Sequence, residues 1–181
     1  HSNGIHRDFV LNTACLLFDK MKLLHGLGRD SRLLLELAAL LHECGYHVNS
    51  STHADSPFSL IRSLRLYGLS ARDNLLVAQI ARQETQPSPS FSDAAPLSES
   101  EQLAVSKLSA IFRLANALDC SKKQKLSDIK VRIEENELRI TAVSQKDALL
   151  ESWAFEQCSG FFEEVFGLKP TLRIKLNIGA V

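Results

Sequence analysis

The residues best suited to chemistry are His42 and Glu43, an adjacent imidazole and carboxylate at the end of the most apolar segment of the chain. If these side chains are buried, they need hydrogen-bond partners or a bound cation. Side chains that could act as partners or as further ligands are His6, His53, Glu84, Asn116 and Asp119. Two interpretations follow: a hydrogen-bonded pair that fixes helix packing, or a divalent metal site with or without hydrolytic activity.

A second group of residues could bind a polyanion. It is basic, lies at and just after the end of an expected long helix, and comprises Arg113, Lys122, Lys123 and Lys125. A row of such side chains gains affinity for a chain of phosphates by releasing its counterions. Cations at the C-terminal end of a helix also complement the helix dipole, so a solvated helix end is the alternative interpretation.

The elements that must position these groups are helices. Apolar residues recur at helical spacing, and the segments begin and end at residues typical of helix caps. Asp30 or Ser31 is the expected N-cap of the second helix, and Ser98 with Glu101 forms a capping-box pattern. The expected helices span residues 5–25, 30–45, 56–67, 70–84 and 98–119, and residues 86–96 form a loop.

The hydrophobic period changes after residue 125. Apolar and polar residues alternate over 129–133 and 138–142, which predicts a β-hairpin. A helix over 147–166, ended by Gly167, and a strand over 171–177 complete the chain. The predicted fold is therefore mostly α, with a helical domain over residues 1–125 and a small α/β domain (β-β-α-β) over residues 126–181.

The composition limits the classes of partner and compartment. Lys plus Arg and Asp plus Glu both number 21, so the net charge of zero provides no long-range attraction to nucleic acid or to a membrane surface. The four cysteines form no CxxC pair, which favours a reducing cytoplasm and argues against a zinc knuckle. No apolar run reaches the roughly 20 residues of a membrane span. The chain begins at His1 rather than Met, which predicts an excised fragment.

Several segments carry a resemblance to a known family. They are HRDFVLNTACLLFD, RLLLELAALLHECGYHVN, LSAIFRLANALD and the tail LLESWAFEQCSGFFEEVFGLKP. In this order they resemble the C-terminal, HD-like region of the exopolyphosphatase and guanosine pentaphosphate phosphatase family. The resemblance implies that the helical domain is of the HD type. It also implies a parent protein whose actin-like N-terminal part hydrolyses polyphosphate or the pentaphosphate nucleotide with magnesium.

The same resemblance assigns the site residues. His6 matches the first HD ligand, His42 the histidine of the motif, Glu43 its acidic partner and Asn116 the position of a final aspartate. Glu43 and Asn116 depart from the metal-binding pattern, because the first displaces the carboxylate and the second removes a negative charge. Asp119, three residues after Asn116 on nearly the same helix face, could replace the lost oxygen ligand. We therefore expect a weakened divalent site, with Mg²⁺ as its ion, and no catalytic residue in this chain.

The expected function is that of an accessory region. It contributes polyphosphate binding, through Arg113, Lys122, Lys123 and Lys125, and homodimer formation to a cytoplasmic hydrolase. The ligand is polyphosphate or a phosphorylated guanosine nucleotide, without a specific nucleic acid or a membrane. The alternatives are a self-standing metal-dependent HD phosphohydrolase and a dimerisation domain that binds no ligand.

Overall fold

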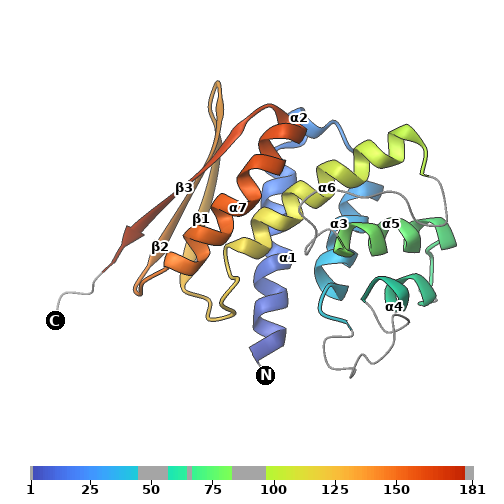
Figure 1. Cartoon of the computed structure of the whole chain (residues 1–181), viewed down its shortest axis with the longest axis horizontal. Coiled ribbons are helices and arrows are strands. Elements are labelled where there is room, and N and C mark those ends of the chain that lie inside the picture. Colours follow the sequence, from blue (N-terminus) through green and yellow to red (C-terminus); the bar gives the residue numbers. More distant parts are fainter. Residues whose placement is uncertain (1, 45–56, 65–66, 83–96, 178–181) are drawn as a thin grey trace.

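The computed structural model of this chain describes residues 2–44, 57–64, 67–82 and 97–177. Its first part is helical, and a three-stranded sheet with one helix follows (Figure 1). The helices of the first part are α1 (Ser2–Lys20), α2 (Lys22–His25), α3 (Arg29–Leu41), α4 (Pro57–Ser63), α5 (Ala71–Arg82) and α6 (Glu99–Ala117). The C-terminal part contains β1 (Leu126–Ile133), β2 (Glu137–Ser144), α7 (Leu149–Phe166) and β3 (Lys169–Leu176). A mostly helical chain that ends in a β-β-α-β unit is thus confirmed.

Local sequence signals explain most helix ends. The capping box at Ser98 and Glu101 is present at the start of α6, as predicted. Gly167 ends α7 in the left-handed conformation, at φ 67°. The predicted N-cap of α3 is wrong, because the helix already begins at Arg29 after an extended Gly28. Asp30 lies instead in the first turn of that helix, where its carboxylate faces the positive end of the dipole.

Two predicted helices are shorter or divided. The segment expected as one helix over 5–25 is interrupted at Met21, which separates α1 from α2. The helix expected over 56–67 ends at Ser63. The expected loop over 86–96, and Gly45 as the end of the second helix, lie outside the described residues.

The sheet has the order β1-β2-β3, with β1 and β2 antiparallel and β2 and β3 parallel. Helix α7 supplies the crossover that a parallel pair requires. In β2, alternate residues Leu138, Ile140 and Ala142 are fully buried, so one face of the sheet packs on the core. Figure 1 shows the sheet at one edge of the molecule, with α7 and α1 on the same side of it. No helix among the described residues covers the opposite face.

A single apolar core joins the helices to the packed face of the sheet. Helix α6 is its centre, since it packs against α1, α3, α5 and α7. Phe112 of α6 and Phe155 and Phe162 of α7 are among the largest fully buried side chains. The C-terminal ends of α3 and α6 and the N-terminal half of α1 carry the candidate site, so the core holds these three helix segments in fixed positions.

Candidate functional site

His6 and Asp119 join the first helix to the end of α6. The two side chains are buried, and His6 Nδ1 lies 2.8 Å from Asp119 Oδ2. A carboxylate acceptor at this distance places the imidazole proton on Nδ1. The other ring nitrogen, Nε2, is then the one that could accept a further hydrogen bond or bind a metal ion.

His42 is held in the same manner by a backbone carbonyl. It lies directly after α3, and its Nδ1 donates to the carbonyl oxygen of Ala39 at 2.8 Å. Its Nε2 is buried and has no hydrogen-bond partner among the described residues. Burial lowers the pKa of His42, so the ring is neutral and Nε2 carries a lone pair. The rings of His6 and Phe112 contact it edge-on, at centroid distances of 5.6 and 5.4 Å.

Glu43 completes a group of three potential metal ligands. One ligand atom each from His6, His42 and Glu43 lies within 4.8 Å of the others. Glu43 also forms an ion pair with Lys122. Burial alone would raise the pKa of Glu43, but the hydrogen bond and positive charge of Lys122 lower it below its usual value, so the carboxylate is ionised. The structure thus places these three side chains close together, with Lys122 beside the carboxylate.

Asp119 mainly organises the loop that follows α6. Besides His6, its carboxylate accepts hydrogen bonds from the backbone N–H of Gln124 at 2.7 Å and from Gln124 Nε2 at 2.8 Å. Lys122 and Gln124 adopt positive φ angles of 56° and 44°, which non-glycine residues adopt only at a cost in free energy. The buried carboxylate holds this strained loop in place. Its two oxygens are occupied by three N–H donors, so it is poorly placed to replace Asn116 as a metal ligand.

Asn116 and two further candidates complete the account of the sequence-derived ligands. Asn116 lies half-buried in the last turn of α6, one turn before Asp119. Its amide brings no negative charge to the site. His53 and Glu84 lie outside the described residues.

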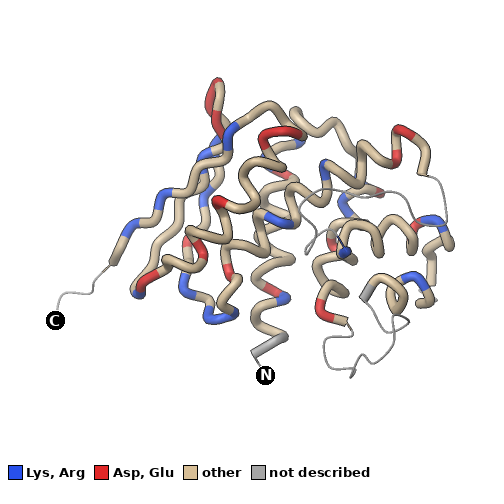
Figure 2. Tube along the Cα trace, viewed as in Figure 1, with Lys and Arg blue, Asp and Glu red and all other residues tan. Residues whose placement is uncertain are grey.

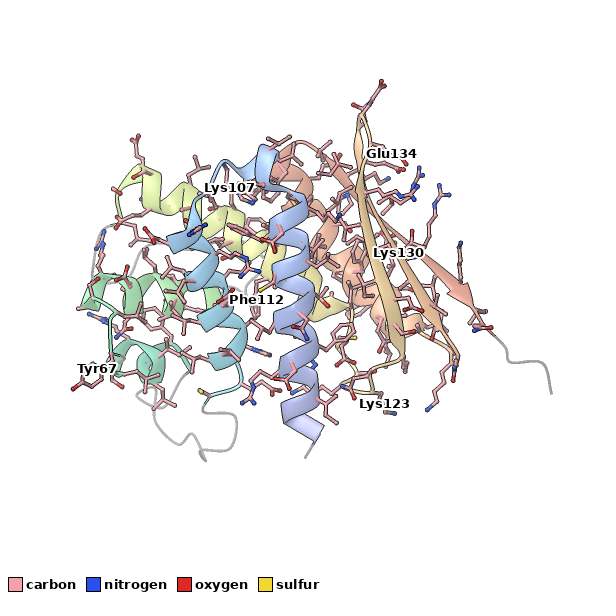
Figure 3. The ribbon with its side chains drawn as sticks, turned by 180° about the vertical axis from the view of Figure 1, so that it is seen from behind. Tyr67, Lys107, Phe112, Lys123, Lys130 and Glu134 are labelled. Atoms are coloured by element: carbon pink, nitrogen blue, oxygen red, sulfur yellow. The ribbon has the colours of Figure 1, made fainter. Side chains whose placement is uncertain are left out.

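The basic residues selected from the sequence do not form one surface. Arg113 is buried, and its guanidinium lies 5.0 Å from the centroid of the Phe161 ring, between α6 and α7. Lys122 pairs with Glu43, and Lys125 pairs with Glu151 at 3.2 Å. Lys123 is exposed and lies at the edge of the molecule in Figure 3. The charges of Lys122 and Lys125 are thus already balanced by neighbouring carboxylates.

Glu151 is a residue of this region that the sequence analysis did not select. It is fully buried in the first turn of α7, and it accepts hydrogen bonds from Ser121 Oγ and Lys125 Nζ. These contacts attach the loop after α6 to the C-terminal helix. Its sequence signal is a single carboxylate in the mostly apolar run LLESWAF, which predicts a buried charge with a specific partner.

Comparison with known proteins identifies the family. The model of the Ppx/GppA phosphatase family, domain III, matches residues 3–159. No curated protein gave a match. Across the parts of the chain that the structure describes, no helix has the length and apolar character needed to cross a membrane. Since the match covers most of the chain, and includes His6, His42, Glu43 and Asn116, this chain belongs to the Ppx/GppA phosphatase family and corresponds to its domain III.

Proposed function

We propose that this chain is an accessory region of an exopolyphosphatase-like hydrolase, in which it binds polyphosphate and pairs subunits. The main hydrolytic reaction takes place outside this chain, in a cytoplasmic protein that acts on polyphosphate or on a phosphorylated guanosine nucleotide. Membership of the Ppx/GppA family supports the class of protein. The assignment of the helical part to the HD type belongs to the same proposal.

The observation that carries the accessory role is the state of the carboxylates around the two histidines. Glu43 is paired with Lys122, and Asp119 is occupied by His6 and Gln124. A hydrolytic centre needs a firmly bound metal ion that activates water, and carboxylates supply much of the attraction for such an ion. Here the charge of Glu43 is offset by Lys122, and the oxygens of Asp119 already accept hydrogen bonds from His6 and Gln124. The arrangement therefore favours a buried hydrogen-bonded cluster that fixes α1, α3 and α6 relative to one another.

An assay of the purified chain tests this role. We expect no release of phosphate from polyphosphate or from a generic phosphomonoester with Mg²⁺ or Mn²⁺, and we expect salt-sensitive binding of polyphosphate. Metal content is measured on the same preparation. Stoichiometric metal and turnover that are both lost in His42→Ala would contradict the accessory role.

One observation favours a second candidate, a self-standing metal-dependent HD phosphohydrolase. His42 Nε2 is a buried lone pair without a hydrogen-bond partner in the described residues, and it lies in a group of three potential ligands. Two imidazoles and one carboxylate suit a transition metal such as Mn²⁺ or Fe²⁺ better than Mg²⁺, which prefers oxygen ligands. Replacement of Lys122 by Met would remove the competing cation. Under this candidate it raises metal occupancy, whereas under the accessory role it leaves the protein metal-free and less stable.

Subunit pairing is supported by apolar side chains on the surface of α7. Leu149, Leu150 and Trp153 are 71%, 57% and 65% exposed. Leu149 also lines a groove of about 420 Å³ together with Ala148, Ile174 and Leu176. A cluster of exposed apolar side chains is typical of an interface between proteins, and we propose a second copy of this chain as the partner.

Sedimentation analysis of variants tests the pairing. Trp153→Asp should raise the dissociation constant of the dimer by at least about tenfold, since a buried aromatic side chain at an interface contributes 2 kcal/mol or more, on the order of a typical hot spot. Leu23→Asp is a matched control, because Leu23 is 99% exposed on α2. Equal dissociation constants for the two variants would contradict pairing through α7.

A further inference from the structure

The open face of the sheet carries a concentration of positive charge. In β2 the buried residues alternate with Glu137, Arg139, Thr141 and Val143, whose side chains therefore point away from the core. Residues paired across neighbouring strands have their side chains on the same face of a sheet. The strand register thus shows which of the paired residues share this face.

The register places basic residues of β1 and β3 on both sides of β2. Thr141 pairs with Lys130 of β1 and with Arg173 of β3. Arg139 pairs with Arg132, Glu137 with Lys169, and Val143 with Lys175. We call Lys130, Arg132, Lys169, Arg173 and Lys175 the open basic face. All five are exposed.

Of the described residues paired with the open basic face, only Glu137, opposite Lys169, carries a carboxylate. Arg139, at the centre of the open basic face, forms ion pairs with Glu134 and Glu137. Within the described parts of the chain, no ion pair involves any of the five members of the open basic face. The acidic residue of β1, Asp128, lies in the irregular segment where the register shifts. Figure 2 shows the resulting run of basic positions along the sheet, and Figure 3 shows Lys130 there, with basic side chains that extend away from the helices.

The exposed cations of this face repel one another, and a bound anion would reduce that repulsion. Arg132 lies directly opposite Arg139, whose charge Glu134 and Glu137 already balance, so Arg132 has no carboxylate of its own. Lysines also protect edge strands against aggregation, and that role would account for single cations on β1 and β3. It does not account for five exposed cations on one face of a chain whose net charge is zero. A bound polyanion would remove the repulsion.

The chemistry of the face limits the class of polyanion. Strands lie about 4.8 Å apart and alternate residues about 6.7 Å apart, so the cations cover an elongated, flat area that suits a chain of closely spaced charges. The residues that share the face include no aromatic side chain on which a base could stack. Proteins that bind single-stranded nucleic acids without sequence preference use such stacking. A linear phosphate polymer without bases fits best.

We propose that the open basic face is a binding site for linear polyphosphate. This inference rests on the proposed function, since it locates the polyphosphate site on the sheet rather than in the loop after α6. Thr141 lies among the cations and can donate a hydrogen bond to a phosphate oxygen, whereas the hydroxyl of Thr171 donates to Glu137 at 3.4 Å. The cations bind by counterion release, so affinity depends on the number of phosphates contacted and falls as the salt concentration rises.

Titration of the full chain with short sodium polyphosphate, at several salt concentrations, tests the site. The variant combines Lys130→Gln, Arg173→Gln and Lys175→Gln. The matched control combines Lys20→Gln, Lys22→Gln and Arg29→Gln, which removes three exposed cations from the helical part. At about 50 mM salt we expect the sheet variant to bind at least about tenfold more weakly, with a log–log salt slope lower by about 2, and the control to bind as the unchanged protein does.

The remaining outcomes would contradict the location of the site, the proposed function or the class of ligand. If the unchanged protein binds and the sheet variant binds equally well, the site is elsewhere and the proposed function stands. If the unchanged protein does not bind polyphosphate even at low salt, the proposed function fails, and this inference fails with it. If single-stranded RNA of equal charge binds as tightly through the same residues, the face is a nucleic-acid site and not a polyphosphate site.

Discussion

The cluster of buried side chains around His6 and His42 differs from the open basic face in whether its charged residues are paired. In the first region, His6 pairs with Asp119, and Glu43 pairs with Lys122. Asp119 also accepts a hydrogen bond from Gln124 in the loop after α6. On the open basic face, five exposed cations share one side of the sheet, and none of them forms an ion pair with another described residue. Both regions are rich in charged residues, but only the second has charge available for a ligand.

The difference separates charges that stabilise the fold from charges that can bind. Burying an ion is costly unless it is paired and hydrogen-bonded, and breaking such a pair leaves an uncompensated charge in the core. Exposed cations cost little to keep solvated, and removing one changes stability only slightly. Variants in the cluster should therefore change the free energy of unfolding, whereas variants on the sheet should change polyphosphate affinity.

The largest effect is expected at Asp119. Asp119→Ala removes three hydrogen bonds from a fully buried carboxylate and leaves the strained loop without its acceptor. We expect a loss of about 3–5 kcal/mol in the free energy of unfolding, measured by urea denaturation. Asp8→Ala is the control. Asp8 is exposed, and its Oδ1 lies 3.9 Å from Arg7 Nε, so this substitution should lower the free energy of unfolding by less than about 0.5 kcal/mol. Equal losses would show that the cluster does not stabilise the fold.

A smaller effect is expected at Lys125, and it separates the two regions directly. Lys125→Ala leaves the buried carboxylate of Glu151 with only Ser121 as partner. We expect it to cost about 2–3 kcal/mol in stability, because Lys125 is 13% exposed, and to leave polyphosphate affinity almost unchanged. Arg173→Ala should do the reverse. If Lys125→Ala weakens binding and keeps full stability, the basic cluster predicted from the sequence is the ligand site.

The sequence contains much of the fold because the signals for helices and strands are local. Apolar periodicity and the capping box at Ser98 predicted the order of elements, including the change from helix to strand after residue 125. The N-cap of α3 was predicted wrongly. Asp30 is a good capping residue, but an extended Gly28 lets the helix begin earlier. A local preference was overridden by the path of the chain from α2.

The sites were less predictable, because they depend on contacts between distant residues. The family resemblance, and not the spacing of the residues, predicted that His6, His42 and Glu43 belong to one site. Nothing in the sequence shows that Asp119 accepts hydrogen bonds from a loop whose residues have positive φ angles. Nor does it show that Glu151 forms an ion pair with Lys125. The open basic face also escaped prediction. Alternation reveals which residues of one strand share a face, but only the parallel register of β2 and β3 places Arg173 beside Thr141 and Lys130.

The smallest effect concerns His25, a buried titratable side chain whose hydrogen-bond partners are backbone groups. Its Nε2 donates to the carbonyl of Phe18 at 2.8 Å, and its Nδ1 accepts from the N–H of Leu27 at 2.9 Å. A neutral ring satisfies both bonds, whereas protonation would remove the acceptor at Nδ1. Burial lowers the pKa of His25 below its ordinary value of 6.5, and the nearby Lys107 adds to this effect.

The sign of the pH dependence follows from this lowered pKa. Because the folded protein binds the proton less tightly than the unfolded chain, the stability contributed by neutral His25 is fully present above pH 6.5 and is lost as the pH falls towards the lowered value. We expect the unfolding free energy to decrease by about 1 kcal/mol between about pH 7.5 and 5.5, measured by urea denaturation. His25→Gln should reduce this decrease, and the remainder belongs to His42, whose pKa is lowered by burial as well. An unchanged decrease in His25→Gln would show that the buried ring is not responsible.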